Sequence, residues 1–187
     1  MEIHRSEVRA TNEMNKYSIR IAQPEDVEDL IRMAKELVTY GHPSNTVLTN
    51  KRELEEYIST WVYCIVLEHI NTEKSRETVG YALWTHGFST SEGKLAQLGS
   101  LYIFPEHRGR GLGYTLLQWV AKLSSSQGCN QLRVTVQRKN KLAKSFYEKA
   151  KVVNMTESHQ RELYGMDDRY FAILATSTPV IPCSSKL

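Results

Sequence analysis

The chain lacks several features that would place it in a specialised class of protein. It has three cysteines, Cys64, Cys129 and Cys183, and neither their number nor their spacing suits a disulfide framework or a metal site. We therefore expect free thiols, as in proteins of a reducing compartment. No apolar run approaches the ~18 residues that a membrane span needs. We also expect no secretory signal, because the N-terminus has no apolar core.

A strong charge of either sign is also missing. The formal net charge is +3 over 187 residues, the basic residues are scattered, and no aromatic platform for bases is evident, so nucleic-acid binding is not expected. An apolar content of 41% and a charged content of 24% are typical of a globular protein. Polarity and proline spacing predict a disordered extension over 1–16, one domain over 17–175 and a flexible tail over 176–187.

The most informative stretch is a glycine-rich segment in the middle of the chain. It reads His107-Arg108-Gly109-Arg110-Gly111-Leu112-Gly113-Tyr114 and runs directly into a helical pattern. Glycine lets backbone N–H groups approach a ligand without a Cβ in the way, and a helix N-terminus adds partial positive charge. The segment has neither the Lys-Ser/Thr of a Walker loop nor the position and spacing of a dinucleotide fingerprint. It therefore predicts a phosphate-binding loop of another type.

Apolar periodicity predicts an α/β (α+β) fold, with a mixed, mostly antiparallel central sheet flanked by helices on both faces. Strands are expected at 17–21, 63–68, 78–85, 94–104, 132–136 and 163–174, the last interrupted near Gly165 with a turn at 166–168. Helices are expected from Pro24 to Val38, from Thr49 or Asn50 to Trp61, from Leu112 to Leu123 and from Lys141 to Ala150. No metal cluster is evident, so no metal cofactor is expected.

Two motifs resemble those of the GCN5-related N-acetyltransferases, whose acetyl donor is acetyl-CoA. One is Arg108-x-x-Gly111-x-Gly113 after an apolar strand, and the other is Asn140-x-x-Ala143-x-x-Phe146-Tyr147. The order of the predicted elements also resembles that of the family. The resemblance implies a pyrophosphate site made by Arg108, Gly109, Arg110, Gly111, Leu112, Gly113 and Tyr114.

The same resemblance implies roles for the neighbouring elements. Backbone groups of Leu101, Tyr102 and Ile103, beside a β-bulge, would bind the cofactor and the oxyanion of the reaction. Asn140 and Ala143 would contact the CoA arm, and Tyr147 would lie near the sulfur as the acid for the departing thiolate. A phenol has a pKa of about 10 and a thiol about 8.5, so the contribution of Tyr147 should be modest.

Several fragments are similar to the diamine (spermidine/spermine) acetyltransferase branch and its thialysine-acetylating relatives. They are 31–37 with Tyr40, 93–95, and Leu163-Tyr164 with Tyr170. Where that branch carries acidic residues in its acceptor site, this chain has Tyr40-Gly41, Gly99-Ser100 and His159. The general base must then lie elsewhere or act through water, and the candidates are His86, Glu92, Glu68 and His159. The expected acceptor is a small primary amine, with long polyamines as poor substrates.

Other functions and the cellular location also follow as expectations. A protein or peptide N-acetyltransferase and a non-catalytic acyl-CoA-binding sensor stay open as alternatives. The resemblance to the diamine branch implies a homodimer. The tail ends in Ser185-Lys186-Leu187, which resembles the peroxisomal import signal and predicts binding to the import receptor. Peroxisomal location is therefore expected, and a cytoplasmic one if the signal is not used.

Overall fold

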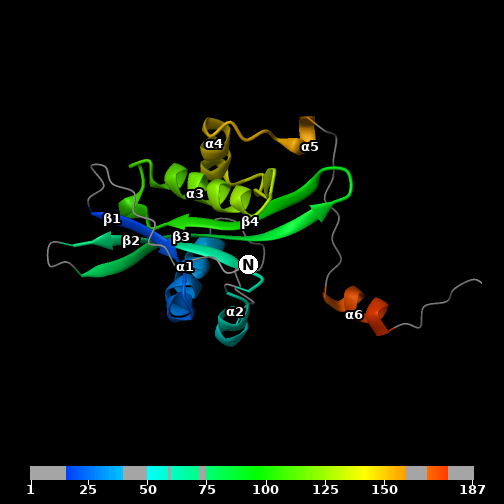
Figure 1. Ribbon diagram of the computed structural model, residues 1–187, viewed down its shortest axis with the longest axis horizontal. Coiled ribbons are helices and arrows are strands. Elements are labelled where there is room, and N and C mark those ends of the chain that lie inside the picture. The colour runs from blue at the N-terminus through cyan, green and yellow to red at the C-terminus, as the bar shows by residue number, and fades with distance from the viewer. Residues whose placement is uncertain (1–15, 40–49, 59, 72–74, 159–167, 177–187) are drawn as a thin grey trace, which may run out of the picture. The chain divides into compact units, whose positions relative to one another are not determined.

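The structure is a computed structural model that describes residues 16–39, 50–58, 60–71, 75–158 and 168–176. The chain divides into two compact units, residues 1–146 and 147–187. The first unit contains a five-stranded sheet in the order β1-β2-β3-β4-β5 (Figure 1). Its strands are β1 (Tyr17–Ile21), β2 (Tyr63–Ile70), β3 (Arg76–Ser89), β4 (Gly93–Ile103) and β5 (Gln131–Val134). All neighbouring strands are antiparallel except β4 and β5, which are parallel.

Helices cover both faces of this sheet, as the sequence predicted. The helices of the described residues are α1 (Val27–Thr39), α2 (Lys51–Tyr57), α3 (Leu112–Ser126), α4 (Lys141–Lys149), α5 (Met155–Ser158) and α6 (Asp168–Thr176), with short 3-10 turns η1 (Pro24–Asp26) and η2 (Pro105–His107). Figure 1 shows α1 and α2 on one face and α3 on the other. Asn50 begins α2 by accepting a hydrogen bond from the backbone N of Glu53 at 2.8 Å, which confirms the predicted cap.

The core of the first unit consists of one stripe from each long helix packed on the sheet. The stripes are Val27, Leu30 and Met33 of α1, and Leu112, Leu116 and Val120 of α3, all almost fully buried. Residues 64–68 of β2 are buried in succession because helices cover both faces of the sheet. This packing fixes the start of α3 against the end of β4.

One predicted element is wrong where the structure describes it. The closing strand was expected over 163–174, but Asp168–Thr176 forms the helix α6, and 163–167 lie outside the described residues. Tyr170, Phe171, Ile173 and Leu174 recur at positions i, i+1, i+3 and i+4, which is helical spacing and not alternation. Alanines between and after them also favour a helix.

Smaller differences concern strand ends and the thiols. β3 extends to Ser89, so the turn expected at 88–93 is shorter, and Val136 lies beyond β5. Cys64 and Cys129 are buried free thiols, whereas Cys183 lies outside the described residues. Among the helices that are described, none has the length and apolar character of a membrane span.

Candidate functional site

The pairing of β4 with its two neighbouring strands changes at Gly99: it is interrupted by one residue on the β3 side and ends on the β5 side. On β3, Trp84 pairs with Leu98 and Leu83 pairs with Ser100, so Gly99 is an extra residue that forms a bulge. On the other side, the pairing with β5 ends at Leu98 and Val134. Past Leu98, no strand in the described ranges pairs with this edge of β4. We call the stretch from Gly99 to Ile103 on that side the free edge.

Backbone groups of Leu101 and Ile103 point to the free edge. The N–H of Phe104 donates to the carbonyl of Val79 on β3 at 3.0 Å. Because successive residues of an antiparallel strand direct their N–H and C=O groups to alternate sides, Tyr102 also pairs with β3 while Leu101 and Ile103 face away. Arg108 Nε donates to the Ile103 carbonyl at 2.7 Å. The Leu101 N–H is therefore placed to donate to a bound group.

The glycine loop follows directly and leaves open space before α3. Gly109 and Gly111 have φ values of 77° and 78°, a left-handed conformation that favours glycine. A Cβ at either position would meet no atom within 4 Å. Gly111 is the N-cap of α3, while Gly113 faces Phe146, whose Cε2 would lie 3.3 Å from a Cβ there. The N-terminus of a fifteen-residue helix thus opens onto unfilled space that suits an anion.

The two arginines of the glycine loop contact residues of β4 and β1. The Arg108 guanidinium lies 5.2 Å from the centre of the Tyr102 ring. Arg110 Nη1 donates to the hydroxyl of Tyr17, which lies 2.9 Å from His107 Nδ1. Burial and the nearby charges of His69 and Arg110 lower the pKa of His107, so this imidazole is neutral near pH 7. Through its contacts with Arg110 and His107, Tyr17 connects β1 to the glycine loop.

The second motif begins with a helix cap. Asn140 Oδ1 accepts a hydrogen bond from the backbone N of Ala143 at 3.0 Å, so its side chain starts α4. This bond uses the side-chain oxygen and leaves the amide NH2 group as a donor. Tyr147, in the second unit, is buried, and burial raises its pKa to about 12. The phenol is therefore fully protonated near neutral pH.

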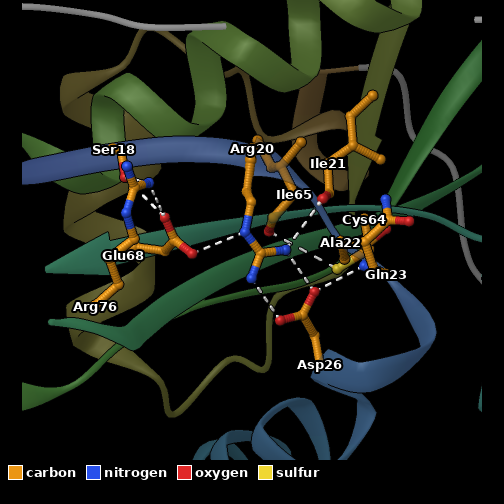
Figure 2. A network of polar contacts seen from close by, with 10 residues as sticks. All are labelled: Ser18, Arg20, Ile21, Ala22, Gln23, Asp26, Cys64, Ile65, Glu68 and Arg76. Atoms are coloured by element: carbon orange, nitrogen blue, oxygen red, sulfur yellow. Dashed lines mark hydrogen bonds and ion pairs between the residues drawn. The ribbon is translucent and has the colours of Figure 1, made fainter. Parts of the chain in front are cut away.

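Both glutamates proposed as the general base are held in ion pairs. Glu68 is buried on β2 and contacts Arg20 at 2.8 Å and Arg76 at 2.9 Å (Figure 2). Burial alone would raise the pKa of Glu68, but the hydrogen bonds from these arginines outweigh it and hold the pKa below its usual range. Glu92 forms an ion pair with Arg133 of β5. Glu68 links β2 to β1 and β3, and Glu92 links the turn before β4 to β5; these ion pairs disfavour both carboxylates as bases.

Of the other residues predicted for the general base or the acceptor site, some lie in the described part of the chain and some do not. The rings of His86 and Tyr63 are tilted against each other with centres 4.4 Å apart, and burial together with the nearby Lys94 lowers the pKa of His86. At the bulge, Ser100 of β4 pairs with Leu83 of β3. Tyr40 and His159 lie outside the described residues.

One carboxylate that the sequence did not indicate reaches β4. Tyr102 donates its hydroxyl hydrogen to Glu36 Oε2 of α1 at 2.5 Å. The two residues are 66 positions apart, so no local pattern could have paired them. Within the described ranges, no group of three His, Cys, Asp or Glu side chains could hold a metal ion.

A family model and individual relatives of known name indicate the same protein family. Residues 28–151 match the model of the acetyltransferase (GNAT) family. The chain is 31% identical over 146 residues to thialysine N-epsilon-acetyltransferase of Bos taurus, covering 75% of this chain and 86% of that protein. The Caenorhabditis elegans protein of the same name is 28% identical over 154 residues, covering 82% and 94%.

Solved structures share the fold. An integron cassette protein from the mobile metagenome of V. cholerae superposes with a TM-score of 0.65 at 20% identity, covering 87% of this chain and 99% of that one. The aminoglycoside N-acetyltransferase AAC(6')-Iy, in complex with CoA, gives 0.61 at 17% identity, covering 81% and 95%. At these identities the likeness concerns the fold alone.

Proposed function

Because this chain belongs to the acetyltransferase (GNAT) family and is an N-acetyltransferase, we propose that it transfers the acetyl group of acetyl-CoA to a primary amine of a small diamine- or thialysine-like molecule. The observation that carries this proposal is the free edge of β4, which runs into a glycine loop with open space before α3. A long, thin ligand with an anionic group at one end and a carbonyl at the other suits that arrangement.

The residues of the site fit acetyl-CoA as the donor. Backbone N–H groups of the loop and the start of α3 would hold the pyrophosphate, with Arg108 and Arg110 beside them. The N–H of Leu101 would donate to the thioester oxygen, where negative charge develops during transfer. The amide of Asn140 would bind the CoA arm.

Replacing Tyr147 by phenylalanine should have a small effect. With a pKa raised to about 12, the phenol remains protonated but is a much weaker acid than a thiol at about 8.5. Tyr147 is therefore better suited to donate a hydrogen bond to the thiolate than to transfer its proton to it. We expect kcat to fall by less than about tenfold with KM for acetyl-CoA unchanged, measured by release of CoA thiol. A loss beyond a hundredfold would make Tyr147 the principal acid.

The expected preference among acceptors is based on the absence of acidic side chains at Gly99-Ser100. Without carboxylates there, the bulge cannot bind the several ammonium groups of a long polyamine. We expect the enzyme to release CoA thiol faster with thialysine or lysine as the acceptor than with spermidine. Arylamines serve as a further comparison. Fast turnover of spermidine would contradict this. Thiol release with none of the amines would favour an acyl-CoA sensor, and release with peptides alone would favour a peptide acetyltransferase.

We also propose import into peroxisomes through Ser185-Lys186-Leu187, which lie outside the described residues, and a homodimer by analogy with the diamine branch. A fluorescent protein fused ahead of the full chain should give peroxisomal puncta. Deleting Leu187 should leave the fusion in the cytosol, because the import receptor reads the C-terminal tripeptide. Puncta that persist without Leu187 would refute the proposal.

A further inference from the structure

Three aromatic rings from separate parts of the first unit meet beside the glycine loop. Tyr17 is the first residue of β1 and pairs with His69 on β2, while His107 is the last residue of η2. The ring centres of Tyr17 and His69 lie 5.0 Å apart, and those of His69 and His107 lie 5.1 Å apart. Strands that take no part in the proposed donor site therefore contact the segment that leads into the loop.

The hydrogen bonds of this cluster run in one direction. Arg110 has donors and no acceptor, so its Nη1 donates to the hydroxyl oxygen of Tyr17. The hydroxyl hydrogen of Tyr17 is then left for His107 Nδ1, at 2.9 Å. A neutral imidazole accepts at one nitrogen and carries its hydrogen on the other, so this contact assigns the proton of His107 to Nε2. Arg110 thus donates to Tyr17, and Tyr17 donates to His107.

This chain of hydrogen bonds holds an arginine that would otherwise be free to rotate. Arg110 is exposed and lies between Gly109 and Gly111, which have no side chains to pack against it. The bond to Tyr17 uses one of the five N–H groups of the guanidinium, so the others remain to bind an anion. Fixing a flexible side chain in advance reduces the entropy that is lost when it binds a ligand.

We propose that Tyr17 and His107 are positioning residues for the donor, which hold Arg110 beside the glycine loop for the diphosphate of acetyl-CoA, and that protonation of His107 disrupts this arrangement. The inference rests on the proposed function and adds a pH dependence to its donor site. A protonated imidazole donates at both nitrogens, so His107 can then no longer accept from Tyr17. It also places a second positive charge near Arg110, and like charges repel.

The charged groups around His107 determine the pH at which this happens. Burial and the positive neighbours His69 and Arg110 lower the pKa of His107, and they outweigh the opposite effect of Glu106 on η2 and Glu77 on β3. His107 therefore gains its proton only below the usual value of about 6.5. The new charge also attracts the anionic donor, but solvent and salt screen that attraction. A lost hydrogen bond to a charged group has the larger effect, so binding should weaken.

The test measures the binding of dephospho-CoA by calorimetric titration at about pH 7.5 and about pH 5. This probe keeps the diphosphate but lacks the 3′-phosphate of CoA, which itself titrates near pH 6. For the wild-type protein, Kd should be at least about threefold higher at the lower pH. Tyr17→Phe keeps the ring and removes the hydroxyl, so Kd should be about tenfold above wild type at the higher pH, with little further change at the lower one.

Two further variants separate this chain of hydrogen bonds from general effects. His107→Asn places an amide oxygen near the position of Nδ1, an acceptor that does not titrate, so Kd should stay within about threefold of wild type and be the same at both pH values. Tyr63→Phe is the matched control for Tyr17→Phe, because Tyr63 also begins a strand and contacts a histidine, His86. Its Kd should stay within about twofold of wild type and keep the wild-type pH dependence.

The outcomes distinguish this inference from the proposed function. A Tyr17→Phe protein that binds dephospho-CoA as tightly as wild type, or a wild-type Kd that is unchanged or lower near pH 5, would overturn the inference and leave the donor site standing. A His107→Asn protein that keeps the wild-type pH dependence would assign the titration to another group and also overturn it. If the wild-type protein binds neither dephospho-CoA nor CoA, the proposed function itself is wrong.

Discussion

A Gly111→Ala variant should bind CoA at least about tenfold more weakly than the wild-type protein. Gly111 has a φ of 78°, and an L-residue in that conformation costs about 1–2 kcal/mol. The chain can relieve this strain only by turning the peptide groups that cap α3, which are the proposed phosphate donors. The new methyl group would also project into the open space before the helix. Calorimetric titration with CoA measures the loss.

Gly128→Ala is the matched control for this variant. Gly128 has a φ of 86°, lies just beyond the other end of α3, and would likewise place a Cβ in open space. The backbone strain is therefore similar, and both variants should lower the melting temperature by similar amounts. Only Gly111→Ala should weaken CoA binding. If the two alanines reduce CoA affinity equally, the loop has no special role in binding the donor.

Local sequence patterns predicted the strand, the glycine loop and the helix of the proposed donor site because each of these signals lies within one short segment. The glycine loop, the strand before it and the stripe of α3 are contiguous in the chain, so spacing alone identifies them. The Asn50 cap was predictable for the same reason, since the cap and its partner are three residues apart. The bulge at Gly99 is a weaker case, because it was expected from family resemblance and its position depends on strand register.

Contacts between distant segments were not predictable in this way. Tyr17 and Arg110 are 93 positions apart, and Glu36 and Tyr102 are 66 apart, yet these pairs fix the arginine of the loop and bring a carboxylate to β4. Glu68 is a second case, because its ion-pair partners are also distant in the sequence. A glutamate in an apolar strand looks available for acid–base chemistry, but Arg20 and Arg76 from neighbouring strands neutralise it. Which side chains share a sheet face follows only from strand order and register.

The largest expected effect on stability comes from Arg20, which lies between two buried carboxylates (Figure 2). It donates to Asp26 through both terminal nitrogens at 2.6 and 2.7 Å and to Glu68 through Nε at 2.8 Å. Arg20→Met leaves these acids in the core without that partner, and breaking a buried pair costs about 3–5 kcal/mol. Because the Arg20 side chain is 36% exposed and Glu68 keeps Arg76, we expect about 3 kcal/mol, measured by urea unfolding near pH 7.

The pH dependence of this loss identifies its cause. Burial alone would raise the pKa values of Asp26 and Glu68, but the hydrogen bonds from Arg20 hold both below their usual ranges. A carboxyl with a lowered folded-state pKa stabilises the protein above its unfolded value of about 4, and this stabilisation disappears as the pH falls through the folded-state pKa. The difference between wild type and Arg20→Met should thus be complete near pH 7 and shrink below about pH 4. Arg76→Met, which removes one half-exposed partner of Glu68, should cost less than about 1 kcal/mol. A difference for Arg20→Met that is the same at both pH values would assign the loss to side-chain packing instead of charge.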